Sequence, residues 1–123
     1  MCYWTFRMPG DYASSPVLKV QYKMASAASL NVRFEARIAA VTVGDLTDVD
    51  TKTMGTTNSN GQVVPGVAGR LGEVSITLTN NDSLAAGDLA IVSLRRDADG
   101  TTGTDDAVGD CEVIAVSLEY TTT

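Results

Sequence analysis

The stretch LNVRFEARIAAVTV, residues 30–43, decides the fold. Its apolar side chains occupy every second position, at Val32, Phe34, Ala36, Ile38 and Ala40. Charged side chains occupy the alternate positions, at Arg33, Glu35 and Arg37. A period of two is typical of a β-strand with one face in a core and the other in water. We therefore predict a long central strand whose outer row is an exposed charge ladder.

Similar patterns elsewhere in the chain predict the partners of this strand. Apolar residues that alternate or run together mark further strands at residues 3–8, 17–24, 73–79, 89–95 and 111–120. The strand 17–24 is the expected hairpin neighbour of 30–43. Trp4 and Phe6 are expected in the core, and Ile114 of the last strand is expected to point inward as well.

The middle of the chain, about residues 44–72, breaks the pattern and is rich in Thr, Gly, Asn and Asp. Within it, residues 51–57 are expected to form an edge strand. The pair Asn60 and Gly61 predicts a turn, because both residues tolerate positive φ. Short strands at this spacing predict an all-β chain, namely a single antiparallel β-sandwich domain over residues 1–123 that is jelly-roll-like.

Charge and hydropathy exclude several classes of function. The chain carries 15 acidic and 9 basic residues, for a net charge of −6, so it repels phosphate backbones and we expect no nucleic-acid binding. No apolar run approaches the ~20 residues of a membrane helix, and the N-terminus lacks the pattern of a signal peptide. We expect a cytosolic protein, or one that leaves the cell inside an assembled particle.

Residues suited to catalysis or metal binding are scarce. There is no histidine, the usual general base at neutral pH, and no serine lies in a G-x-S-x-G motif. Glu35, between Arg33 and Arg37, is expected to be solvated. Cys2 and Cys111 are expected to be free thiols, with a disulfide as the alternative, and they are too few for a zinc site. We therefore expect no enzyme and no cofactor.

One loop has ligand-like content. Its aspartates are Asp97, Asp99, Asp105, Asp106 and Asp110. Oxygen-rich loops can hold Ca²⁺, but the spacing differs from an EF-hand, because Gly100 falls too early and no glutamate closes the ring. The pattern predicts a solvated loop of turns without a metal.

Two tyrosines are candidates for a glycan site, because a sugar ring stacks on an exposed aromatic ring. Tyr12 lies in the link at residues 11–16, and Tyr3 lies on the polar face of the first strand. Trp4 is expected to pack in the core instead.

Several longer motifs carry a resemblance to a known group of proteins. They are FRMPGDY, VLKVQYKM, NVRFEARI, SITLTNNDSLAAGDLAIVSLRRDADG and GDCEVIAVSLEY. Together these motifs resemble a group of small phage-encoded virion proteins, over nearly the whole chain except residues 44–72. The resemblance implies a non-enzymatic, jelly-roll-like protein of the virion, either a capsid decoration (cement) protein or a module of a head or tail fibre.

The resemblance also implies partners. We expect a homo-oligomer, with a trimer favoured by analogy, that contacts the major capsid protein or other virion proteins. The alternative is a carbohydrate-binding module that recognises receptors from a fibre or spike. The candidate interaction surface comprises Arg33, Arg37, Arg95, Arg96 and Tyr12. In this set, Arg95 and Arg96 precede Asp97 and suit ion pairs between subunits.

Overall fold

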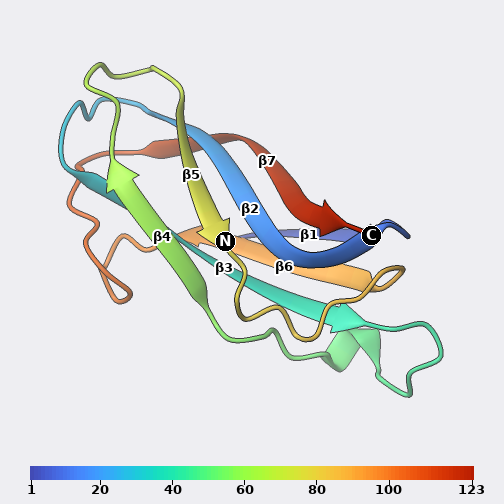
Figure 1. The fold of residues 1–123 in the computed structure, drawn as a ribbon. Coiled ribbons are helices and arrows are strands. Elements are labelled where there is room, and N and C mark those ends of the chain that lie inside the picture. The colour runs from blue at the N-terminus through green and yellow to red at the C-terminus, as the bar shows by residue number, and fades with distance from the viewer.

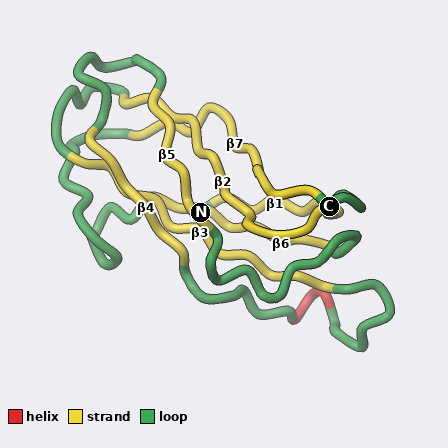
Figure 2. The backbone as a smooth tube through the Cα atoms, viewed as in Figure 1, coloured by secondary structure: helices red, strands yellow, loops and turns green.

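The computed structural model describes all residues 1–123 and is a β-sandwich of two antiparallel sheets (Figure 1). The strands are β1 (Cys2–Arg7), β2 (Tyr12–Met24), β3 (Asn31–Val41), β4 (Asn58–Val63), β5 (Gly72–Thr77), β6 (Leu89–Arg96) and β7 (Cys111–Thr122). One sheet has the order β1-β6-β3-β4, and the other has the order β5-β2-β7. A single 3₁₀ turn, η1 (Val49–Thr51), is the only helical element (Figure 2). The predicted all-β single domain is confirmed.

The core lies between the two sheets and is built from alternating positions. The inward row of β3, from Val32 to Ala40, is buried as predicted. The inward row of β2 is buried too and consists of Leu18, Val20, Tyr22 and Met24. The ring centroids of Tyr22 and Phe34 lie 5.6 Å apart across the sandwich, which is within the usual range for aromatic pairs. Burial of these two faces against each other is what makes the sheets stack.

The expected hairpin of β2 and β3 is wrong, because the two strands belong to different sheets. β3 pairs with β6 on one side and with β4 on the other, whereas β2 pairs with β5 and β7. Both strands present a long apolar face, and such faces are buried by packing face to face rather than edge to edge. The chain between them therefore crosses from one sheet to the other.

The middle of the chain supplies one strand, but not where the sequence placed it. Residues 51–57 contain no strand, and β4 begins after them. Asn60 and Gly61 do not form a turn but pair with Phe34 and Arg33 of β3. A side chain at Gly61 would lie 2.6 Å from the Val32 carbonyl oxygen, so glycine is needed here for close approach of the backbones.

A β-bulge in β7 changes which of its alternating side chains point toward the core. Val116 lies opposite Val20, but the register shifts so that Val113 lies opposite Tyr22, and Ile114 is left without a partner. Ile114 is therefore exposed, which corrects the expectation that it points inward. The same shift turns Cys111 toward the core, where it is half-buried.

The first strand is less buried than the sequence suggested. Met8 is buried and Phe6 is half-buried, but Trp4 remains 36% exposed, so its placement in the core is wrong. β1 lies at the edge of the four-stranded sheet, and the facing sheet has only three strands. Its inward side chains therefore lack a complete layer to pack against. Cys2, at the start of β1, is an exposed free thiol.

Phe34 is the side chain whose truncation should damage this core most clearly. It is 1% exposed, so Phe34→Ala should lower the free energy of unfolding by about 3–5 kcal/mol through lost burial and an internal cavity. Val43→Ala is the matched control, because this side chain is 90% exposed and should change stability by less than about 0.5 kcal/mol. Urea unfolding followed by circular dichroism measures both, and equal effects would contradict the assigned core.

Candidate interaction surface

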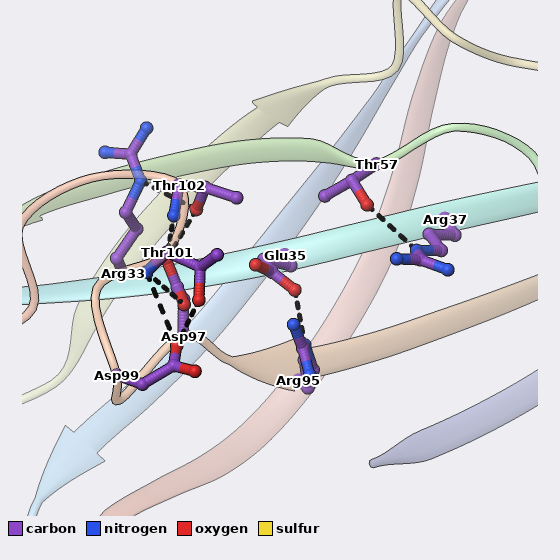
Figure 3. Close-up of polar contacts among 9 residues, drawn as sticks. All are labelled: Arg33, Glu35, Arg37, Thr57, Arg95, Asp97, Asp99, Thr101 and Thr102. Atoms are coloured by element: carbon purple, nitrogen blue, oxygen red, sulfur yellow. Dashed lines mark hydrogen bonds and ion pairs between the residues drawn. The ribbon is translucent and has the colours of Figure 1, made fainter.

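The outer face of the four-stranded sheet gathers three of the five residues predicted as an interaction surface. Arg33 and Arg37 lie on the same face of β3, and Arg95 of β6 is in register with Glu35 between them. Figure 3 shows the four side chains along this face. The remaining two residues, Arg96 and Tyr12, lie elsewhere.

Glu35 is not solvated, which corrects the expected charge ladder. Its side chain is only 4% exposed, and its carboxylate accepts a hydrogen bond from Nε of Arg95 (Figure 3). This hydrogen bond, followed by the negative charge of Glu35, raises the pKa of Arg95. Since the Arg95 side chain remains 42% exposed, the pair presents its cationic side to solvent.

The two arginines of β3 have different surroundings. Arg33 donates hydrogen bonds to Thr102 Oγ1 at 3.2 Å and to Ser59 Oγ at 3.1 Å. Arg37 is exposed and donates a single hydrogen bond to Thr57 Oγ1 at 2.9 Å. Arg33 thus holds a loop against the sheet, whereas Arg37 has donors free for another molecule.

Glycine at position 103 makes room for the Arg33 side chain. A Cβ at Gly103 would lie 2.6 Å from Arg33 Cζ, and the residue has a φ of +154°. Any other residue there would displace the guanidinium from Thr102. This requirement comes from residues 70 positions apart, so the local sequence carried no sign of it.

The loop after β6 is folded around Asp97 rather than solvated. Asp97 is 1% exposed, and its carboxylate accepts hydrogen bonds from Thr102 N–H at 2.7 Å, Thr102 Oγ1 at 2.6 Å and Thr101 N–H at 3.0 Å. Burial alone raises the pKa of Asp97, but the hydrogen bonds from Thr102 and Thr101 outweigh burial and hold it well below its usual range. The expected solvated loop is therefore wrong.

Arg96 is occupied inside the chain. It donates to Asp105 at 2.7 Å and to the carbonyl oxygens of Ala107 at 2.5 Å and Gly109 at 2.6 Å. Asp105 also accepts from Arg33 N–H at 3.0 Å. Arg96 thus fastens the loop to the end of β3, and this corrects its expected role in ion pairs between subunits.

No group of three or more His, Cys, Asp or Glu side chains is placed to hold a metal ion.

Tyr12 is not in a loop, and it is not exposed. It is the first residue of β2 and is 5% exposed, with its ring 5.5 Å from that of Tyr120. Burial raises the pKa of the Tyr12 hydroxyl. β2 begins earlier than expected because residues 12–16 pair irregularly with the end of β7 through two register shifts. Tyr12 is therefore removed from the interaction surface, while Tyr3 is 60% exposed.

Three exposed apolar side chains were not among the predicted site residues. Val43, Leu46 and Val49 lie in the connection between β3 and β4, and Leu46 is fully exposed. Their sequence signal is that they are apolar residues within an otherwise polar stretch. This connection projects beyond the sheets in Figure 1.

Comparisons with known proteins leave the structure as the main source of functional information. No protein family matches the sequence, and no curated protein or solved structure is similar to it. No helix of the chain has the length and apolar character to span a membrane.

Asp97 allows a test of the loop by pH. Because its pKa is lower in the folded chain, ionised Asp97 stabilises the fold fully above its ordinary value of 3.8, and this contribution is lost as the pH falls toward the folded value. Asp97→Asn should lower stability at neutral pH, and the deficit should shrink between about pH 5 and about pH 2. Urea unfolding across this range measures the effect.

Asp110→Asn is the matched control, because Asp110 is exposed and its carboxylate accepts no hydrogen bond. A deficit for Asp97→Asn that is independent of pH would mean that the folded loop does not depend on the charge of Asp97.

Proposed function

We propose that this chain is a non-enzymatic structural protein of a bacteriophage virion, namely a capsid decoration (cement) protein that stabilises the head. In this proposal the protein is made in the host cytoplasm. It then binds the major capsid protein, or another virion protein, as a homo-oligomer that we expect to be a trimer. The resemblance of its motifs to phage virion proteins supports the proposal, and so does the β-sandwich fold that the resemblance implies.

The observation that carries the proposal is a row of three arginines on one face, two of which keep exposed side chains. The net charge of the chain is −6, yet the outer face of β3 and β6 carries three arginines around one glutamate. Arg37 points to solvent with a single hydrogen bond, and Arg95 stays exposed while it neutralises Glu35. Hydrogen bonds to Thr57 and Glu35 fix the positions of Arg37 and Arg95 before any partner binds. Such a face suits an acidic surface on the capsid.

Exposed apolar side chains occupy the connection that follows β3. Val43 and Leu46 follow the end of β3 and point into solvent. Exposed apolar residues among polar ones are frequent in protein interfaces. The connection between β3 and β4 therefore extends the proposed docking face, with apolar contact at Leu46 and charge at Arg37.

Capsids assembled without this protein provide the direct test. Purified wild-type protein should bind them and raise the temperature at which they disrupt. Arg37→Glu and Leu46→Asp should each weaken binding by about tenfold or more, which is about 1.4 kcal/mol, without loss of fold. Leu71→Asp is the matched control, because Leu71 is also exposed but lies outside the proposed docking face.

Two results would contradict the proposal in different ways. If the protein does not bind capsids and its deletion leaves capsid stability unchanged, the role in the head is wrong. If it binds but both docking-face variants bind like wild type, the contact lies on another surface.

A carbohydrate-binding module remains the second candidate, and one observation favours it. Tyr3 is 60% exposed on the outer side of β1, where a sugar ring has access to its face. Under this candidate, Tyr3→Ala should abolish signals on a glycan array. Tyr12→Phe should leave them unchanged, because Tyr12 is buried. An array that is silent for the wild-type protein contradicts this candidate.

A further inference from the structure

The two long sides of the sandwich differ. On one side β4 contacts β5, and Asn60 Nδ2 donates a hydrogen bond to the Ser75 carbonyl oxygen at 2.8 Å. On the other side the edges are β1 and β7, and no hydrogen bond joins them. We call this second side the β1–β7 seam.

The β1–β7 seam is open because one sheet is a strand wider than the other. The four-stranded sheet ends at β1, and the three-stranded sheet ends at β7. The inner face of β1 consequently faces only the margin of the other sheet, at Leu18, Val116 and Leu118, across a cavity. Trp4 on this face is 36% exposed and Cys2 is also exposed, although both have the inward parity of buried Met8.

Two cavities follow from this missing cover. A cavity of about 350 Å³ lies beneath β1, and its apolar lining comes from both sheets, at Trp4, Phe6, Leu18, Val92, Val116 and Leu118. A second cavity of about 420 Å³ lies further along the seam, beside Cys2, Cys111 and Val113. The apolar residues on either side of the seam are therefore incompletely packed in the single chain.

The backbone edges at the seam lack two of the usual protections of an edge strand. Edge strands of soluble proteins usually carry lysine or proline, which discourage pairing with another strand. β1 (CYWTFR) and β7 (CEVIAVSLEYTT) contain neither residue. The bulge at Ile114 interrupts the edge of β7, so the parts suited to accept a further strand are β1 and the regular stretch of β7 from Ala115 to Glu119.

We propose that the seam is covered by a second copy of this chain, with β1 of one copy paired to the free edge of β7 in the next. The projecting β1 of each copy then lies where the neighbour's three-stranded sheet is one strand short. This contact closes both free edges and covers the inner face of Trp4. A rotation axis parallel to the strands repeats this β1–β7 contact in every copy of a closed ring, so that no β1 or β7 edge remains unpaired.

Charge favours a second copy as the occupant. Arg7, at the end of β1, forms no ion pair within its own chain, and it lies on the outer face beside the turn that leads into Tyr12. Tyr12 pairs with Thr122, so Arg7 lies toward the C-terminal end of β7. A rotation axis parallel to the strands leaves the strand directions unchanged. The end of β1 that carries Arg7 therefore meets the C-terminal end of the neighbour's β7, which carries Glu119.

Glu119 is available for this contact. Its side chain is 65% exposed, and its only cationic partner is Lys19 at 3.9 Å. Lys19 lies equally far from Glu73, also at 3.9 Å, so one ammonium group serves two carboxylates. A second cation near Glu119 would complete the neutralisation of this cluster.

The proposal rests on the homo-oligomer included in the proposed function and names the surface that would form it. The mass of the purified protein tests this contact without capsids, so failure here is distinguishable from failure of capsid binding. Light scattering on the wild-type protein should give a discrete mass of two or three chains. Arg7→Glu and Glu119→Arg should each weaken association by about tenfold or more, and the double variant Arg7→Glu with Glu119→Arg should restore it.

Two further variants separate the seam from other surfaces. Trp4→Lys, which places a charge on the inner face of β1, should yield a folded monomer by light scattering and circular dichroism. Leu46→Lys is the matched control and should keep the wild-type mass, because Leu46 lies on the connection between β3 and β4.

A wild-type protein that is monomeric at tens of micromolar overturns the proposal and leaves the seam to a different protein. An oligomer that survives Trp4→Lys also overturns it, as does a double charge reversal that fails to restore association. If Trp4→Lys fails to fold, the charge-reversal pair decides, because Arg7 and Glu119 are both exposed.

Discussion

Face-to-face packing of β2 and β3 is the interaction on which the rest of this structure depends. Each strand buries an alternating apolar row, and Tyr22 meets Phe34 where the rows cross. Because these two strands lie in different sheets, their contact sets the stacking of the sandwich. β6, β4, β5 and β7 then add to their edges by backbone hydrogen bonds. The outer face of β3 is left for polar side chains, and this is where the candidate docking face forms.

Polar contacts decide which parts of that outer face remain available. Asp97 orders the loop after β6 through Thr101 and Thr102, and Arg96 fastens it further through Asp105. Arg33 is used in the same way, whereas Arg37 and Arg95 keep exposed donors. Charged residues that look alike in the sequence thus divide into those that hold the chain together and those able to meet a partner.

The uneven width of the two sheets connects the fold with assembly. A three-stranded sheet cannot cover a four-stranded one, so β1 projects and its inner face remains open. The proposed pairing of β1 with a neighbouring β7 would use the same strands that leave the single chain incomplete. The docking face on β3 and β6 lies on the outer side of the sheet, so both contacts are compatible within one particle.

The sequence by itself determined the all-β class, most strands and the inward rows of β2 and β3, because a period of two depends only on local geometry. Tertiary structure alone decided the strand pairing, the burial of Glu35 and Tyr12, and the exposure of Trp4. Each depends on a partner distant in the chain: Arg95 for Glu35, Tyr120 for Tyr12, and the width of the facing sheet for Trp4. Alternation shows which way a side chain points, but not what lies opposite it.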